Sequence, residues 1–148
     1  RFGNGTVLLA EDNEVNALVA IAALSRLGLE VEHVLSGQGV VRRMCTHGER
    51  PDIVLLDCQM PEMDGFEACR LVRAFEAEHG IERAPIVALT ANVFQQDRDR
   101  CREAGMDAFL GKPFSDQELR HILTMYSVVP HSGGTQAGAL EAAYAARL

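Results

Sequence analysis

Residues 53–66 read IVLLDCQMPEMDGF, and this stretch decides the fold. The four apolar residues Ile53–Leu56 are typical of a short strand buried on both faces, and that strand ends at Asp57. Pro61 and Gly65 supply the turn conformation that starts the following helix. A buried strand that ends on an acid either caps its own turn or presents the carboxylate to a ligand.

Strand-like and helix-like segments alternate along most of the chain. Strands are predicted at Thr6–Ala10, Leu29–Val34, Ile53–Leu56, Ile86–Leu89 and Ala108–Leu110, and helices at Val15–Leu27, Gly37–Thr46, Gly65–Glu78, Asn92–Ala104 and Ser115–Tyr126. Helix caps are predicted at Asp64, Asn92 and Ser115, and helix ends at Gly28 and Gly105. Strict alternation with short connections predicts an α/β, flavodoxin-like (βα)5 fold, a doubly wound parallel sheet of strand order 2-1-3-4-5 with helices on both faces.

The composition predicts one globular domain that contacts neither nucleic acid nor membrane. Of the 148 residues 47% are hydrophobic, and the net charge is −7 without any stripe of basic residues. The longest apolar run, Ala17–Leu24, is too short to span a bilayer. We therefore expect a cytoplasmic domain, although its parent protein can be membrane-anchored.

The four cysteines lie far apart, without a C-x-x-C pair or a histidine at metal-ligand spacing. They are Cys45, Cys58, Cys69 and Cys101. This pattern argues against a zinc site and against a disulfide framework. We expect all four to pack as small apolar side chains in a reducing cytosol.

The globular domain is predicted to cover residues 1–126, followed by a linker and an Ala-rich tail at residues 127–148. Leu140, Tyr144 and Leu148 recur at helical spacing in this tail. It is either a helix that begins another domain or only the end of the chain. Because the sequence starts with Arg1 rather than Met, we expect a piece of a longer protein.

Polar side chains stand at the carboxyl ends of four predicted strands. They are Glu11 and Asp12 after the first strand, Asp57 after the third, Thr90 after the fourth, and Lys112 followed by Pro113 after the fifth. Each has an ordinary explanation alone, as a turn, cap or solvated residue. Because the four strands are neighbours in the predicted order, these side chains should converge beyond the sheet, where open α/β sheets bind ligands.

The chemistry of this group suits a metal ion and a phosphoryl group. Clustered carboxylates repel one another and protonate unless a cation is present, and an all-oxygen ligand set favours Mg²⁺. The Lys112 ammonium and the Thr90 hydroxyl complete an anion pocket that fits phosphoryl oxygens. Asp57 is then the candidate nucleophile, which would form an acyl phosphate.

Four segments of the sequence carry a resemblance to a known family: LLAEDNEVN, DIVLLDCQMPEMDGFEACRLVR, IVALTAN and AGMDAFLGKPF. In sequence, spacing and predicted position they resemble the receiver domain of two-component response regulators, most closely the receivers of hybrid sensor histidine kinases. The resemblance covers about residues 6–126. It implies a phosphoacceptor in a phosphorelay, which takes a phosphoryl group from a phosphohistidine and relays the signal by conformational change or onward phosphotransfer.

The resemblance also implies a role for each residue of the group. Asp57 is the phosphoacceptor. The Mg²⁺ ligands are Glu11, Asp12, Asp57 and the backbone carbonyl of Gln59. Thr90 carries the hydroxyl that moves onto the phosphoryl group, and Lys112 pairs with that group.

The fifth strand carries two further implications. A cis peptide bond is implied at Lys112-Pro113, where an X-Pro bond makes the cis form accessible. Phe109 stands at the family's aromatic switch position but cannot make the hydrogen bond of the tyrosine found in many members, so a working switch and a plain core aromatic both stay open. On phosphorylation, the face of the fourth helix, fifth strand and fifth helix is expected to change.

Two other functions compete with a relay. Haloacid-dehalogenase-type phosphatases also use a strand-end aspartate, but they need an acid two residues later, where this chain has Gln59. We hypothesise instead that Gln59 and Asn92 tune the attacking water and so the lifetime of the phosphoryl group. A scaffold that never takes phosphate is disfavoured, because the acids and Lys112 are all present.

The alternative to a hybrid-kinase fragment is a stand-alone single-domain response regulator that acts by protein–protein interaction. The domain itself would catalyse only the phosphorylation and dephosphorylation of its own Asp57, whereas the parent chain is expected to be a histidine kinase, a transferase. Expected partners are the phosphohistidine-bearing dimerisation domain of a histidine kinase, a His-containing phosphotransfer protein, and a second copy in a phosphorylation-dependent homodimer.

Overall fold

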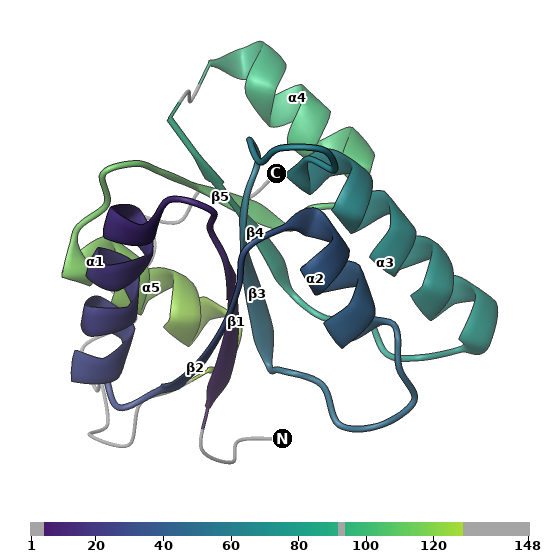
Figure 1. Cartoon of the computed structure of the whole chain (residues 1–148), viewed down its shortest axis with the longest axis horizontal. Helices are drawn as coiled ribbons and strands as arrows, with labels where there is room; N and C mark the ends of the chain where they lie inside the picture. The colour runs from purple at the N-terminus through teal and green to yellow at the C-terminus, as the bar shows by residue number, and fades with distance from the viewer. Residues whose placement is uncertain (1–4, 92–93, 129–148) are drawn as a thin grey trace.

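A parallel sheet of five strands forms the centre of the molecule, and helices cover both of its faces (Figure 1). The computed structural model describes residues 5–91 and 94–128. The strands are β1 (Thr6–Ala10), β2 (Glu30–Val34), β3 (Ile53–Asp57), β4 (Ile86–Thr90) and β5 (Ala108–Gly111). The helices are α1 (Glu14–Arg26), α2 (Gly37–Met44), α3 (Gly65–His79), α4 (Gln95–Ala104) and α5 (Asp116–Met125).

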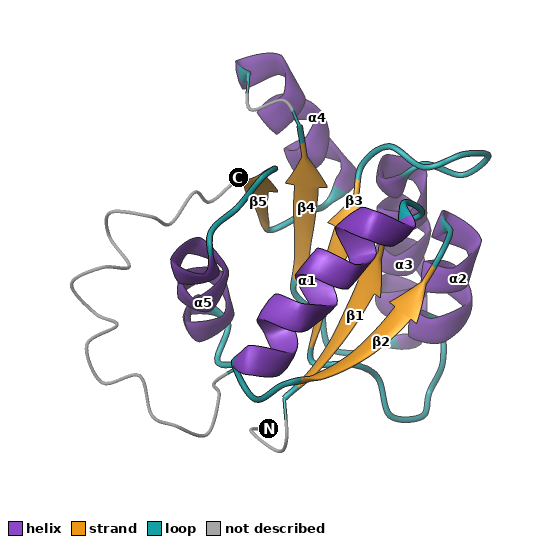
Figure 2. Ribbon diagram, turned by 60° about the vertical axis from the view of Figure 1, so that its left-hand side comes forward, coloured by secondary structure: helices purple, strands orange, loops and turns teal. Residues whose placement is uncertain are grey.

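The strands lie in the order β2-β1-β3-β4-β5, so the predicted topology is confirmed. Leu55 of the central strand β3 pairs with Leu9 of β1 on one side and with Val87 of β4 on the other. All five residues of β3 are buried, as its continuous apolar run predicts, whereas β2 at the edge is only half-buried. The strand arrows in Figure 2 all point to one edge of the sheet, where the polar strand ends therefore meet.

Two helix starts follow the predicted capping residues. The carboxylate of Asp64 accepts the backbone N–H of Glu67 at 2.9 Å at the start of α3. Ser115 and Glu118 form a reciprocal capping box at the start of α5. Gly105 ends α4 with a φ of 100°, a conformation that a residue with a Cβ adopts at a cost.

The predicted start of the fourth helix at Asn92 was wrong. The helix α4 begins at Gln95, and Phe94 occupies the N-cap position without a side-chain capping bond. The backbone of Phe94 is extended (φ −73°, ψ 159°), so helical hydrogen bonding starts only after it. Asn92 itself lies outside the described residues. Among the described residues, none of the helices has the length and apolar character needed to cross a membrane.

The sheet separates two apolar cores. Successive strand residues point to opposite faces, so Leu9 and Leu55 pack against α1 and α5, while Leu8 and Leu56 face α2, α3 and α4. Val128 also packs in the α1 and α5 core and is 3% exposed. Packed structure thus extends two residues past the predicted domain end, and the remainder of the predicted tail lies outside the described residues.

The amino edge of the sheet, opposite the polar strand ends, is closed by a network of ion pairs, most of them buried. Glu76 of α3, which is 4% exposed, accepts hydrogen bonds from Arg50 at 3.0 Å and from Arg73 at 2.8 Å. Arg73 also binds Asp107 at 2.7 Å, and Arg83 binds the same carboxylate at 2.8 Å. The network joins the loops that precede β3, β4 and β5.

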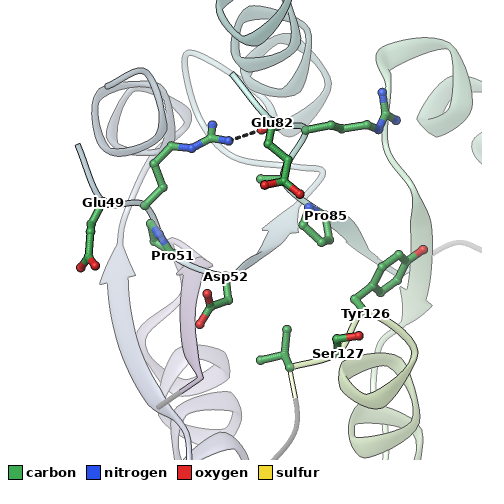
Figure 3. Close-up of a pocket in the computed structure, with 11 residues that line it drawn as sticks. Glu49, Pro51, Asp52, Glu82, Pro85, Tyr126 and Ser127 are labelled. Atoms are coloured by element: carbon green, nitrogen blue, oxygen red, sulfur yellow. Dashed lines mark hydrogen bonds between the residues drawn. The ribbon is translucent and has the colours of Figure 1, made fainter. Parts of the chain in front are cut away.

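A hollow of about 500 Å³ opens at this amino edge (Figure 3). Its polar lining already holds the fold together. Arg50 donates to the carbonyl of Glu82, the dashed line in the figure, and the Asp52 carboxylate accepts the N–H of Thr6 at 2.8 Å. The Tyr126 hydroxyl donates to a backbone carbonyl at 3.3 Å. This hollow therefore offers structural contacts rather than a candidate reactive group.

Candidate functional site

Three carboxylates meet at the carboxyl edge of the sheet. Glu11 and Asp12 follow β1 directly, and Asp57 is the last residue of the neighbouring strand β3. Carboxylate oxygens of the three residues lie within 4.8 Å of one another. Glu11 and Asp57 are 2% and 4% exposed, whereas Asp12 is exposed. The structure thus brings together the acids that the sequence places at separate strand ends.

Asp57 is held by the backbone on both sides. Its Oδ1 accepts the N–H of Gln59 at 3.0 Å, and the N–H of Cys58 donates to the Leu89 carbonyl of β4 at 3.1 Å. A Cβ at Gly65 would collide with the carbonyl oxygen of Asp57, so only glycine allows α3 to begin this close to the strand end. The carboxylate is therefore fixed in direction before any ligand arrives.

Lys112 is the only lysine of the chain, and it lies between two of the acids. Its Nζ is 3.3 Å from Oε1 of Glu11 and 3.4 Å from Oδ2 of Asp57. Its backbone N–H donates to the Thr90 carbonyl at 2.8 Å, which fixes the chain just after β5. The peptide bond to Pro113 is cis, as the family resemblance implied.

The site is short of positive charge. Burial and the neighbouring Glu11 raise the pKa of Asp57 above its ordinary value, against the lowering effects of the Gln59 N–H and of Lys112. Burial would lower the pKa of Lys112, but the carboxylates of Asp57 and Glu11 outweigh it and raise that pKa. The Lys112 ammonium thus pairs with two of the three acids, and this hard, all-oxygen set fits a divalent ion such as Mg²⁺.

The remaining predicted site residues lie around this cluster. Thr90 ends β4, one residue past the strand partner of Asp57, and is half-buried. Gln59 is exposed on the loop after β3. Asn92 lies outside the described residues. The roles predicted for these side chains stay predictions.

Phe109 lies in the core between the sheet and α4. It is 7% exposed, and the Arg98 guanidinium lies over its ring at 4.7 Å from the centroid. This is the packing expected of a core aromatic. It is also compatible with one state of a switch, so both interpretations of Phe109 stand.

Two contacts at the site escaped the sequence reasoning. Nε2 of His33 lies 2.8 Å from the carbonyl oxygen of Glu11, and the N–H of Asn13 donates to Oε2 of Glu11 at 3.2 Å. Asn13 also caps α1 through the N–H of Asn16 at 2.9 Å. The register of β2 against β1 is the signal that could have revealed His33, because it places this residue beside the end of β1.

The family of the chain follows from comparison with known proteins. A family model, the response regulator receiver domain, matches residues 7–124. The chain belongs to the response regulator receiver domains. The receiver domain is 37% identical, over 141 residues and 95% of its own length, to hybrid signal transduction histidine kinase L of Dictyostelium discoideum. It spans only 8% of the length of that kinase.

Solved structures of receiver domains agree with this assignment. The receiver domain of a sensor histidine kinase from Pseudomonas aeruginosa, with a magnesium ion coordinated in its active-site cleft, is 42% identical with a TM-score of 0.75, covering 84% of this chain and 98% of that one. The receiver domain of the response regulator Ssk1 from Saccharomyces cerevisiae, crystallised with the histidine phosphotransfer protein Ypd1, is 28% identical with a TM-score of 0.76, covering 86% of this chain and 91% of that one.

Proposed function

We propose that this receiver domain accepts a phosphoryl group from a phosphohistidine onto Asp57, with Mg²⁺, and relays the signal by conformational change or onward phosphotransfer. One observation carries the proposal: the buried carboxylate of Asp57 lies at a strand end, within reach of two further acids and Lys112. The parent protein is proposed to be a hybrid sensor histidine kinase, like the Dictyostelium relative. A stand-alone regulator remains the alternative for the whole protein.

The residues of the site divide the reaction between them. An oxygen of Asp57 attacks phosphorus, the phosphorus–nitrogen bond of the phosphohistidine breaks, and the imidazole leaves with the electron pair of that bond. Glu11, Asp12, Asp57 and the carbonyl of Gln59 would hold Mg²⁺, which would neutralise charge on the phosphoryl oxygens. Lys112, 3.4 Å from Asp57, offers these oxygens a fixed positive charge. Thr90 would donate its hydroxyl to them.

The first test is the mass of the intact protein after incubation with acetyl phosphate and Mg²⁺. We expect one added phosphoryl group, and we expect that group to be absent from Asp57→Asn and from wild type treated with a chelator. Folded protein without an adduct under any of these conditions, and without a stable beryllofluoride complex, would contradict the proposal.

The lifetime of the phosphoryl group is proposed to depend on Gln59 and Asn92. Gln59 is exposed on the loop after Asp57, and its amide cannot act as a general acid, so the aspartyl phosphate should outlast that of a phosphatase. Substituting both residues by alanine should change the rate at which the mass adduct disappears. An unchanged rate would remove both residues from this role.

An apolar stripe on α1 is the proposed docking surface for the phosphohistidine partner. Val15, Leu18 and Val19 are 68%, 67% and 63% exposed and lie one helical turn apart on one face. The helix starts two residues after Asp12, so this stripe lies beside the reacting groups. A similar receiver is known in complex with a histidine phosphotransfer protein, which supports a partner of this kind.

The docking surface is tested by comparing two phosphoryl donors. With Leu18→Asp, transfer from a phosphorylated His-containing phosphotransfer protein should fall about tenfold or more, since a charge in an apolar interface costs affinity. Loading from acetyl phosphate should not change, because the site is intact. Leu71→Asp, on the exposed side of α3, is the matched control and should leave both rates unchanged. An equal loss with both variants would contradict a specific α1 interface.

A further inference from the structure

The edge strand β2 also sends a polar side chain to the carboxyl edge of the sheet. His33, the next-to-last residue of β2, lies beside Leu9 of β1 in the parallel register and is half-buried. Its Nε2 is 2.8 Å from the carbonyl oxygen of Glu11. A carbonyl oxygen can only accept a hydrogen bond, so Nε2 carries a hydrogen and donates it.

The direction of the His33 side chain follows from the pleat of the strand. Val31, two residues earlier and on the same face of β2, packs in the α1 and α5 core. Figure 2 shows β1 and β2 ending at the same edge, with α1 in front of them. His33 therefore lies on the α1 side of the sheet, where the chain leaves β1 and enters α1 through residues 11–13.

The carbonyl that His33 binds belongs to the peptide group that joins Glu11 to Asp12. A peptide group is planar, so fixing its oxygen restricts the Cα positions of both acids. The N–H of Glu11 donates to the Val34 carbonyl of β2 at 3.2 Å, which fixes the preceding peptide group as well. Two successive peptide groups at the end of β1 are thus bound to β2, one by its backbone and one by the His33 ring.

The two acids depend on this backbone to different degrees. Glu11 is buried, and its carboxylate is also bound by the Lys112 ammonium at 3.3 Å and by the N–H of Asn13 at 3.2 Å. Asp12 is exposed, so the direction of its carboxylate depends mainly on the backbone that carries it. The contact with His33 should therefore matter most for the orientation of Asp12.

We propose that His33 is a positioning residue of the Mg²⁺ site, whose Nε2–H holds the peptide between Glu11 and Asp12 so that both carboxylates can bind one ion. The inference rests on the Mg²⁺ site of the proposed function. Mg²⁺ demands a nearly ideal octahedron of oxygen ligands, so a displaced carboxylate lowers its affinity. Losing a hydrogen bond that orients metal ligands typically lowers metal affinity about tenfold or more. His33 acts through the peptide and is not itself a ligand.

Three variants separate this role from simple packing. His33→Phe keeps a flat ring in the same place but has no hydrogen to donate. In His33→Gln the amide nitrogen is as many bonds from the backbone as Nε2 of histidine, so this variant should restore the hydrogen bond. His79→Phe is the matched control, because it removes an imidazole that is exposed at the far end of α3.

The first experiment measures the Kd for Mg²⁺ from backbone amide NMR shifts, without any phosphoryl donor. His33→Phe should bind Mg²⁺ about tenfold more weakly or worse, whereas His33→Gln and His79→Phe should stay within about threefold of wild type. A folded His33→Phe that binds as tightly as wild type would overturn the proposal.

The same spectra show whether each variant is folded. If His33→Phe is not, His33→Leu takes its place, since leucine is smaller and also lacks a donor. If neither variant folds, the contact serves the fold rather than the metal, and the proposal is overturned. If wild type binds no Mg²⁺, the proposed function and the inference fail together.

The second experiment measures the rate of loading by acetyl phosphate over a range of Mg²⁺ concentrations. For His33→Phe the Mg²⁺ concentration at half-maximal rate should rise about tenfold or more. The rate at saturating Mg²⁺ should stay within about threefold of wild type, because Asp57 is held by the N–H of Gln59. A lower maximal rate with an unchanged Mg²⁺ requirement would overturn the proposal. If wild type binds Mg²⁺ but takes no phosphoryl group, the proposed function fails, and the NMR titration still decides on His33.

Discussion

The two edges of the sheet both bury charge, but they balance it differently. At the amino edge, Glu76 and Asp107 are surrounded by the guanidinium groups of Arg50, Arg73 and Arg83. At the carboxyl edge, three acids lie together, and the Lys112 ammonium pairs with only two of them, Glu11 and Asp57. The acids of the amino edge are thus paired within the protein, whereas the cluster at the carboxyl edge has the oxygen ligands to hold a cation.

The hydrogen bonds of the two edges differ in the same way. Arg73 also donates to the carbonyls of Ala84 and Gly105, and Glu76 accepts the N–H of Ala84 at 2.9 Å, so spare donors and acceptors are used by backbone groups. At the carboxyl edge, the carboxylate oxygens of Glu11, Asp12 and Asp57 lie close together, and their negative charges repel one another. Buried charge that is fully paired supports the fold, and buried charge of one sign indicates a binding site. Substitutions should therefore have opposite effects at the two edges.

The largest effect is expected for Glu76→Gln. This change keeps the size of the side chain but leaves the guanidinium groups of Arg50 and Arg73 without their shared counter-ion. Removing one partner of a buried pair typically costs about 3 kcal/mol, so the free energy of unfolding in urea should fall by that amount. Phosphoryl loading of the folded fraction should not change, because Asp57 is at the other edge.

Glu78→Gln is the matched control for this prediction. Glu78 is exposed on the same helix, so the free energy of unfolding of the Glu78→Gln variant should stay within about 0.5 kcal/mol of wild type. If Glu76→Gln were no more destabilised than Glu78→Gln, the amino edge would not be held together by its ion pairs.

Lys112→Met should have the next largest effect, which is on the rate of phosphoryl transfer rather than on stability. Methionine keeps much of the aliphatic length but removes the charge 3.4 Å from Asp57. Loss of one fixed charge or donor at a reacting group typically lowers rates about a hundredfold, and we expect that loss in the rate of loading by acetyl phosphate at saturating Mg²⁺.

Lys112→Arg separates charge from shape at the same position. It restores the charge in a bulkier, planar group, so loading should recover only in part. A rate for Lys112→Met equal to that of wild type would show that the ammonium is not needed for the transfer.

A smaller effect is expected for Asp57→Asn in the presence of a chelator, and it is a gain in stability rather than a loss. Because the pKa of Asp57 in the folded protein lies above its ordinary value of 3.8, the ionised group destabilises the metal-free fold. Wild type should lose stability relative to Asp57→Asn as pH rises from 3.8 through the raised pKa, which a comparison of urea unfolding of the two proteins over this pH range measures. In excess Mg²⁺ wild type should instead be more stable than Asp57→Asn.

Asp64→Asn serves as the control for this reversal. Asp64 is a helix N-cap, where asparagine serves equally well, so the stability difference between this variant and wild type should not depend on Mg²⁺. If Asp57→Asn behaved in the same way, the carboxyl edge would not be short of positive charge.

The contrast between the edges also explains what the sequence could predict. The acids of the carboxyl edge stand directly at strand ends, so the hydrophobic pattern that fixes the strands also fixes where Glu11 and Asp57 lie. The amino-edge network joins residues such as Arg50 and Glu76, which are 26 positions apart and have no pattern around them. Long side chains that pair across loops leave no periodic signal.

Two helix starts were predictable because a side chain makes the cap. Asp64 and Ser115 bind the first free N–H groups of their helices, and both starts were correctly predicted. The helix α4 begins after Phe94 without such a bond, so the polar residue at position 92 was misleading.

The smallest effect is expected for the ion pair of Arg26 and Asp116, which joins α1 to α5. Its 2.9 Å separation matches the pairs of the amino edge, but its side chains are 60% and 55% exposed. Water already solvates both charges, so a double-mutant cycle with Arg26→Gln and Asp116→Asn should give a coupling below about 0.5 kcal/mol, reduced further by salt. The cycle also cancels the separate effect of Asp116 on the start of α5. A coupling as large as that between Arg50 and Glu76 would mean that distance, rather than burial, decides the strength of these pairs.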